Sequence, residues 1–289
     1  MSLRYKSEPA CPGRLTVLAV TAAMAFISAG LASAGTVPTP RAGIPSYGSP
    51  VCGKNWVPVN LGSGDYLNVY NGTHSSDYTC VKVPTAGRAA WSITKVVNPV
   101  SWWLYPNISA GWEWGRYTCN DGRSASPSSP GSRCMRFPVR TGSMGRVHAS
   151  MRMSSYPQTG RYNVSWDIWF SKTAKTPVYQ NDAAEIMIWV GSRNIRVLHQ
   201  RKVYIDSHWW WVEYWNVKRS GVTWKLTVFS LVHPLTVVTN MYIDPLVSWV
   251  ARAGRVSLND YLTAIDFGAE ISAGTPLMSF SDYSLTGVN

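Results

Sequence analysis

Short runs of alternating or aromatic-rich residues follow one another along most of this chain and are separated by turn residues. Such runs cover residues 64–72, 88–96, 145–153, 161–170, 184–190, 209–217, 222–230 and 261–271. Runs of this length and spacing are typical of antiparallel sandwiches and barrels, not of alternating strands and helices. We therefore predict one all-β domain over residues 51–289, with no internal repeat and no second domain.

One segment departs from the strand pattern. In residues 243–254, Asp244 is suited to cap a helix, and Pro245 to occupy its first position. Leu246 and Trp249 then share a helical face, and Gly254 is suited to end the helix. The sequence thus predicts a single short helix near residues 244–253.

The amino-terminal segment has the pattern of a secretory signal. Arg4, Lys6 and Arg14 precede an uncharged stretch over residues 15–31, and Ala-Ser-Ala at 32–34 supplies small residues at a cleavage site. A single membrane anchor is the alternative, because the stretch approaches the length that spans a bilayer. We predict a signal peptide over 1–34, a Pro- and Gly-rich flexible leader over 35–50, and a secreted protein that is not membrane-bound after cleavage.

Composition adds a hint of function. The 289 residues are 45% apolar and only 15% charged, so a large core is expected. Fifteen Trp and fifteen Tyr against six Phe favour flat faces with hydrogen-bonding edges, as in binding clefts. The net charge of +12 is scattered, with no run of Lys or Arg longer than a pair, so we expect no nucleic-acid partner. A monomer is expected.

Cysteine usage agrees with export. Cys52, Cys80, Cys119 and Cys134 lie beyond the signal segment, and an even number in an oxidising compartment suggests two disulfides. Three pairings are possible, and Cys52–Cys80 with Cys119–Cys134 is the one made of two local loops. A zinc site is the alternative, but it is disfavoured because no Cys-x-x-Cys pair exists and His is scarce.

Three strand-like runs place acidic groups among aromatic or small residues. Only four glutamates follow the signal segment, and two of them lie inside apolar runs, where a carboxylate is costly without a partner or a function. The period of two puts Glu185, Met187 and Trp189 on one face of their strand, with aliphatic residues behind.

The same period puts Asp266 and Glu270 on one face of the run at 261–271, and Asp167 and Trp169 on one face of the run at 161–170. Each acidic residue alone fits the solvated face of a half-exposed sheet. The three runs together favour a cleft lined by carboxyl groups.

Paired carboxyl groups on a Trp-rich sheet suit glycoside hydrolysis. That reaction needs one ionised carboxylate and one carboxylic acid flanking the bond, and sugar rings stack on indole faces. No Gly-x-Ser-x-Gly elbow, catalytic His–Asp–Ser pattern or phosphate-binding glycine loop is present. No metal or organic cofactor is implied.

These residues resemble glycoside hydrolase family 12, secreted endoglucanases and xyloglucanases with a β-jelly-roll fold. The run Glu185-Ile186-Met187-Ile188-Trp189 is similar to the family's nucleophile strand, and Phe267-Gly268-Ala269-Glu270 to its acid/base strand. The run at 162–170 resembles the strand whose Asp hydrogen-bonds the nucleophile, and Tyr105-Pro106-Asn107-Ile108 matches a further signature. Cys52 and Cys80 fall where the family's amino-terminal disulfide falls.

The resemblance implies a jelly-roll sandwich of two antiparallel sheets and a β-glucan substrate. By this resemblance Glu185 is the nucleophile, Glu270 the acid/base and Asp167 the residue that orients Glu185, while Met187, Trp189 and Trp169 line the cleft. Two departures reduce the aromatic surface: Asn71-Gly72-Thr73-His74 lacks the family's platform Trp, and Ser272 stands where many bacterial members have Trp. These departures put the glucan preference in question.

Two other functions fit parts of the sequence. A non-catalytic carbohydrate-binding or wall-loosening protein on the same scaffold would bind glucan and release no reducing ends. A basic cell-surface adhesion module would instead bind anionic polymers in a salt-sensitive way.

Overall fold

The computed structural model describes residues 48–52, 58–60, 66–70, 78–84, 90–97, 104–113, 116–118, 137–174, 183–219 and 222–288. The expected signal peptide at 1–34, the leader up to residue 47, and the expected Cys119–Cys134 pair lie outside these described residues. In the part of the chain that is described, no helix combines the length and apolar character needed to cross a membrane.

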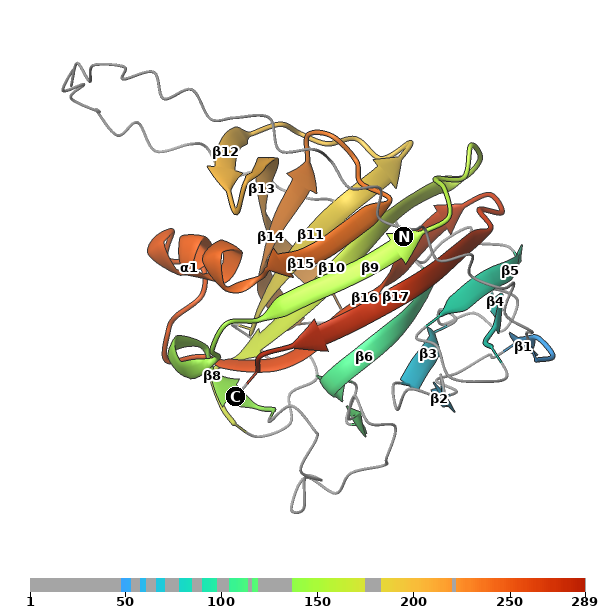
Figure 1. The fold of residues 1–289 in the computed structure, drawn as a ribbon. Coiled ribbons are helices and arrows are strands. Elements are labelled where there is room, and N and C mark those ends of the chain that lie inside the picture. The colour runs from blue at the N-terminus through green and yellow to red at the C-terminus, as the bar shows by residue number, and fades with distance from the viewer. Residues whose placement is uncertain are drawn as a thin grey trace, which may run out of the picture.

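The described strands form two sheets (Figure 1). The smaller sheet has the order β1 (Val51–Cys52), β4 (Tyr78–Lys82), β5 (Trp91–Val97), β17 (Met278–Thr286), β9 (His148–Met153) and β15 (Val237–Tyr242). The larger sheet has the order β12 (Arg201–Ile205), β13 (His208–Arg219), β14 (Val222–Leu231), β11 (Ala183–Arg193), β10 (Arg161–Ser171), β16 (Tyr261–Ala273), β6 (Tyr105–Glu113), β3 (Tyr66–Tyr70) and β2 (Pro58–Asn60). Two short strands lie outside this order: β7 (Arg116–Thr118) pairs with β6, and β8 (Val139–Arg140) pairs with β16. The predicted all-β jelly-roll sandwich is confirmed.

The hydrophobic core lies between the two sheets. Aromatic rings connect them: Trp91 of β5 stacks on Phe280 of β17 with ring centroids 4.4 Å apart. Phe280 meets Phe267 of β16 edge-on at 5.5 Å, and Phe267 contacts Trp166 of β10 at 4.7 Å. These side chains are fully or almost fully buried. The core therefore fixes one face of β10 and β16 and leaves their other face for the site.

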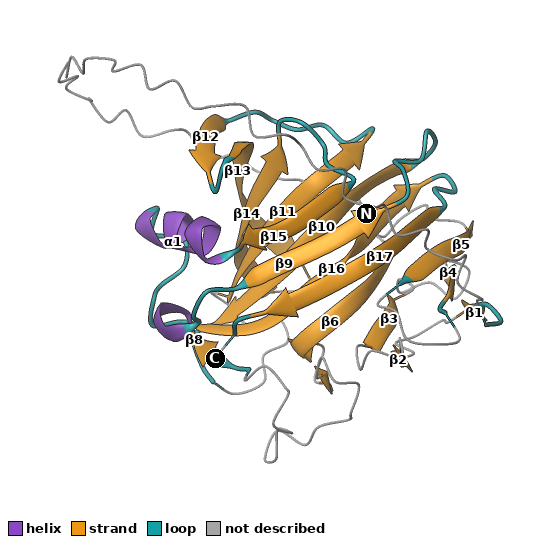
Figure 2. Cartoon of the chain, in the orientation of Figure 1, coloured by secondary structure: helices purple, strands orange, loops and turns teal. Residues whose placement is uncertain are grey.

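The predicted helix is present as α1 (Asp244–Arg252), beside the sandwich (Figure 2). Its start differs from the prediction, because Ile243 is the residue before the helix and Asp244 already belongs to the first turn. In the first turn the negative charge of Asp244 interacts favourably with the positive end of the helix dipole, but its side chain does not cap the helix. Gly254 follows the helix with φ of 70°, a conformation that favours glycine. A 3₁₀ turn at Thr141–Ser143 was not predicted.

The prediction of antiparallel sheets is wrong at one pair, because β11 and β14 run parallel. The strands β12, β13 and β14 alternate in direction, and residues 194–200 carry the chain back after β11, so that β12 starts in the same direction as β11. The strand β14 then lies beside β11 in the same direction. This crossover leaves the β12–β13 hairpin at the edge of the larger sheet (Figure 1).

Two long strands were missed by the alternation pattern. In β17 the buried positions run Met278, Phe280, Tyr283 and Leu285, because a register irregularity near Asp282, whose φ is 54°, shifts the period by one. The strand β6 contains Pro, Asn and Gly, residues that are rare in strands, and forms because β3 and β16 pair with it on both sides.

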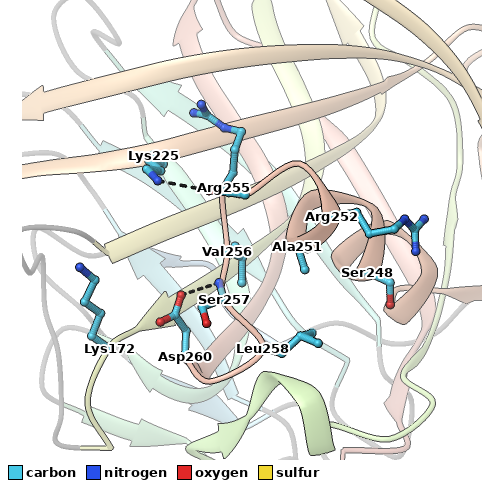
Figure 3. Close-up of a pocket in the computed structure, with 11 residues that line it drawn as sticks. Lys172, Lys225, Ser248, Ala251, Arg252, Arg255, Val256, Ser257, Leu258 and Asp260 are labelled. Atoms are coloured by element: carbon cyan, nitrogen blue, oxygen red, sulfur yellow. Dashed lines mark hydrogen bonds between the residues drawn. The ribbon is translucent and has the colours of Figure 1, made fainter. Parts of the chain in front are cut away.

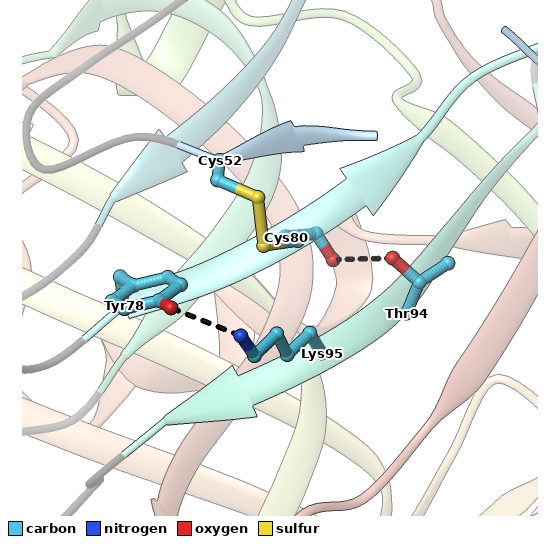
Figure 4. The surroundings of a disulfide bond; sticks show 5 residues. All are labelled: Cys52, Tyr78, Cys80, Thr94 and Lys95. Atoms are coloured by element: carbon cyan, nitrogen blue, oxygen red, sulfur yellow. Dashed lines mark hydrogen bonds between the residues drawn. A yellow bond between two sulfur atoms is a disulfide. The ribbon is translucent and has the colours of Figure 1, made fainter. Parts of the chain in front are cut away.

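The predicted disulfide between Cys52 and Cys80 is present and joins β1 to β4 (Figure 4). The Cys80 carbonyl accepts a hydrogen bond from Thr94 Oγ1 at 3.3 Å, and Lys95 Nζ donates to the Tyr78 hydroxyl at 3.1 Å. The bond ties an edge strand of the smaller sheet to the rest of that sheet.

Candidate active site

The three acidic strands predicted from sequence are neighbours in the larger sheet, with β10 between β11 and β16. On the face away from the core, Asp167 lies opposite Met187 of β11 and opposite Asp266 of β16. After Asp167 on β10, Trp169 lies opposite Glu185 of β11, and before Asp167, Asn163 lies opposite Glu270 of β16. The fold therefore gathers all the acidic residues expected at the site onto one sheet face.

Glu185 lies in an apolar and aromatic surrounding. Its side chain is buried, and its Oε2 accepts a hydrogen bond from Trp224 Nε1 of β14. Trp224 in turn packs against Trp169, with ring centroids 6.1 Å apart. The predicted cleft residues Met187, Trp189 and Trp169 belong to the same cluster, which is separate from the core between the sheets. A carboxylate held this way has one fixed oxygen and a dry environment.

Glu270 is held by a polar pair on β10. Its Oε2 accepts a hydrogen bond of 2.6 Å from Asn163 Nδ2, and Asn163 Oδ1 accepts one of 3.1 Å from Ser165 Oγ. The hydroxyl of Ser165 therefore fixes the orientation of the amide, which presents its NH₂ group to Glu270. Asn163 and Ser165 are fully buried, whereas the side chain of Glu270 is partly exposed.

Burial shifts the protonation of all three carboxyl groups. Burial raises the pKa of Glu270 to about 7, although the hydrogen bond from Asn163 lowers it. Burial, reinforced by the charges of Glu185, Glu270 and Asp266, raises the pKa of Asp167 well above its ordinary value. Burial also raises the pKa of Glu185, to about 8, although hydrogen bonds from Asp167 and Trp224 lower it.

The hydrogen bond between Asp167 and Glu185 changes the pKa values of these two residues in opposite directions. It raises the pKa of Asp167 and lowers that of Glu185. Asp167 is therefore the protonated partner, and its O–H donates the hydrogen bond to Glu185. The charge of Glu270 raises the pKa of both groups further. Burial thus favours the neutral form of both glutamates near neutral pH, and the hydrogen bonds from Asp167 and Trp224 favour the carboxylate that a nucleophile at Glu185 requires.

Solved structures with the same architecture include several family 12 hydrolases. A metagenome-derived family 12 endoglucanase superimposes with a TM-score of 0.65 at 23% identity, covering 83% of this chain and 97% of that protein. An endoglucanase from Rhodothermus marinus gives 0.65 at 24% identity, covering 83% and 99%. A family 12 xyloglucanase from Bacillus licheniformis gives 0.65 at 21%, covering 83% and 100%.

The fold is that of glycoside hydrolase family 12.

Sequence comparison agrees with this resemblance. Endoglucanase S of Pectobacterium parmentieri is 26% identical over 185 residues, which are 62% of this chain and 64% of that protein. The chain thus matches about 64% of the length of this curated relative. No protein-family model matches the sequence. The resemblance first indicated by the Glu185–Trp189 and Phe267–Glu270 motifs is confirmed by these similarities.

Within the family 12 fold, two site residues were not named from the sequence, and a third, Asp266, was placed on the site face without a role. Asn163 contacts Glu270, Trp224 contacts Glu185, and Asp266 is fully buried beside Asp167. The period of two does place Asn163 on the same face as Asp167, and Asp266 on the same face as Glu270. Trp224 carries no such signal, because its strand is paired with β11 only through the parallel crossover.

One glycine lets a neighbouring strand approach the site closely. A side chain at Gly268, between Asp266 and Glu270 on β16, would collide with the Pro106 carbonyl and the Asn107 backbone of β6. Pro106 and Asn107 belong to the signature predicted from sequence, and Asn107 is fully buried on β6. The signature therefore borders the acid/base strand of the family 12 fold.

A separate cavity of about 680 Å³ lies at the end of α1 (Figure 3), and none of the site carboxyl groups lines it. Lys172, Lys225, Arg252 and Arg255 line it, together with Asp260. Arg255 donates to the Trp215 and Leu226 carbonyls at 2.7 and 3.1 Å, and Lys225 donates to the Gly254 carbonyl at 3.3 Å. These contacts fasten the segment after the helix to the sheet. The site carboxyl groups do not line this cavity, so it is not the catalytic candidate despite its size.

Across the described residues, no group of three or more His, Cys, Asp or Glu side chains is arranged to hold a metal ion. Within the site, Glu185 accepts a hydrogen bond from the Trp224 indole, and Glu270 accepts one from the Asn163 amide.

Proposed function

We propose that the protein is a secreted retaining endo-β-1,4-glucanase that cuts internal bonds of cellulose-like or related β-glucans. The observation that supports this most directly is the group Glu185, Asp167 and Glu270, which three neighbouring strands place on one face of a family 12 sheet. The names of the similar proteins, endoglucanases and a xyloglucanase, agree with a β-glucan substrate. We further propose that residues 51–289 form the single hydrolase domain.

In the first half of the reaction, the Glu185 carboxylate attacks the anomeric carbon, and the bond to the glycosidic oxygen breaks. Glu270, protonated near neutral pH, gives its proton to the departing oxygen. The sugar is then linked covalently to Glu185, and the cut chain leaves with a free hydroxyl. Asp167 and Trp224 stabilise the charge on Glu185 before the attack.

In the second half, the ionised Glu270 takes a proton from a water molecule, and the oxygen of that water attacks the anomeric carbon. The bond to Glu185 breaks, which regenerates its carboxylate and the proton on Glu270. Trp189, Met187 and Trp169 line the path of the sugar. The indole N–H of Trp189 is buried and has no hydrogen-bond partner among the described residues.

Release of reducing ends from a panel of soluble β-glucans tests this function, with Glu185→Gln and Glu270→Gln as matched variants. Glu185→Gln should abolish turnover on every substrate, because no nucleophile remains. Glu270→Gln should retain activity on an aryl cellobioside with an acidic leaving group, and added azide should speed it by forming a β-glycosyl azide. An α-glycosyl azide would exclude retention at Glu185.

The outcome also separates hydrolysis from simple binding. If the wild-type protein bound β-glucan and released no sugar, it would be a non-catalytic carbohydrate-binding or wall-loosening protein on this scaffold. If both variants kept wild-type rates, the assignment of the glutamate pair would be wrong.

A further inference from the structure

The β12–β13 hairpin ends the larger sheet (Figure 1), and two of its large aromatic side chains are exposed. Tyr204 of β12 is 59% exposed and Trp209 of β13 is 48% exposed. They lie opposite each other in the strand register, and their ring centroids are 5.1 Å apart. Exposed aromatic pairs on an edge hairpin are a liability for aggregation unless they contact a ligand.

This pair lies on the same sheet face as the candidate active site. Along β13, Trp210 and Val212 are buried in the core, so Trp209, Trp211 and Trp215 face the other way. Trp211 lies opposite Ser230 of β14, and Ser230 lies opposite Trp189 of β11. A single row across three strands thus leads from Trp189 to Trp211, and Trp209 is two residues beyond.

The space between Trp189 and Trp211 is open. A cavity of about 240 Å³ is lined by both indoles and by His199 and Val197. The segment 194–200 that walls this cavity is fixed, because the Leu198 N–H donates to Glu213 Oε1 at 2.8 Å and His199 packs on Trp211 at 4.5 Å. A ligand leaving Trp189 would therefore meet a preformed wall that leads to Trp211.

The orientation of the outer rings is also fixed. The Lys202 ammonium lies 4.9 Å from the Trp209 ring centroid and 5.7 Å from that of Trp211. A cation between two indoles restrains both rings before any ligand arrives, which reduces the entropy lost on binding.

We propose that Tyr204 and Trp209, continued inward by Trp211, form a distal platform that binds the β-glucan chain beyond the cleaved bond. The inference rests on the proposed function, which supplies the ligand: a neutral chain of β-linked hexopyranoses, whose C–H faces stack on aromatic rings. The platform favours long chains over short ones, because a short substrate held at Glu185 and Glu270 does not extend to Trp209.

The test compares a soluble polymeric β-glucan with a short aryl cellobioside, using the double variant Tyr204→Ala, Trp209→Ala. The ratio of kcat/KM on the polymer to kcat/KM on the aryl cellobioside should fall by roughly 5- to 10-fold, with the loss in KM for the polymer. Leu277→Ala is the control, since Leu277 is similarly exposed at 56% and lies away from the hairpin. An unchanged ratio in a folded double variant would overturn the platform.

A binding measurement keeps this result distinct from the proposed function. In affinity electrophoresis through gels containing β-glucan, the double variant should be retarded less than wild type, whether or not wild type hydrolyses the polymer. Retardation lost in an otherwise inactive protein would support the platform and refute the glucanase proposal. Equal retardation, or stronger retardation by polygalacturonate than by β-glucan, would refute the platform.

Discussion

Asp167 and Trp224 both donate a hydrogen bond to the Glu185 carboxylate, from the two strands that flank β11. Asp167 comes from β10 and Trp224 from β14, and both hydrogen bonds lower the pKa of Glu185 against the effect of burial. Burial alone would protonate Glu185 and remove the nucleophile. The two donors are therefore as important to the proposed chemistry as the glutamate itself.

Replacing these donors should change the pH profile more than substrate binding. Asp167→Asn should lower kcat and leave KM nearly unchanged, because Asp167 acts on the charge of Glu185. Trp224→Phe removes one hydrogen bond to a charged group, which should cost on the order of tenfold in kcat/KM at acidic pH. The acidic limb of its profile should move to higher pH, since Glu185 then ionises less readily. An acidic limb that stayed in place in Trp224→Phe would mean that this bond does not set the ionisation of Glu185.

At the scale of elements, the site depends on how closely β6 approaches β16. Gly268 permits that approach at a point directly between Asp266 and Glu270. The neighbouring strand positions are fully buried, so β6 cannot move outward without disturbing the core.

Gly268→Ala should therefore destabilise the protein by about 1–3 kcal/mol, the usual cost of overpacking a well-packed interior. Thermal unfolding followed by circular dichroism would measure the effect as a Tm lower by at least ~2 °C. Gly254→Ala provides the comparison, because a side chain there meets nothing within 4 Å and is strained only by its φ of 70°. If the Gly268 variant were as stable as wild type, the close packing of β6 against the acid/base strand would be incorrect.

At the scale of the whole molecule, the buried carboxyls couple catalysis to stability. A raised pKa in the folded state means that the folded protein binds more protons than the unfolded chain does. For Glu270 this holds between its ordinary pKa, near 4.5, and about 7. Its contribution is thus fully present below pH 4.5 and is lost as the pH rises through about 7.

Glu270→Gln should consequently be more stable than wild type at pH 8, and the difference should shrink toward pH 5. The amide keeps the size of the side chain and removes the charge that burial disfavours. Each kcal/mol should appear as ~2–4 °C in Tm for a domain of this size. Parallel melting curves of the two proteins at pH 5 and pH 8 measure the change, and a constant Tm difference would show that Glu270 is not buried as a proton-binding group.

The sequence alone determined the faces of the strands that matter most. Alternate residues of a strand point to opposite sides, so the positions of Glu185, Asp167 and Glu270 relative to their aliphatic neighbours follow from spacing. The sequence also predicted the helix, with Pro245 in its first turn and Gly254 after its end, and the Cys52–Cys80 pair. Each of these depends on residues that are not far apart in the chain.

The tertiary structure decided which of these faces meet. The order of strands places β10 between β11 and β16, and the crossover after β11 brings β14 alongside in parallel. Asn163 reaches Glu270 and Trp224 reaches Glu185 only through that order. Period-two patterns specify which way a side chain points and not which strand lies next to it, since strand order is set by long-range packing and hydrogen bonding between segments far apart in the chain.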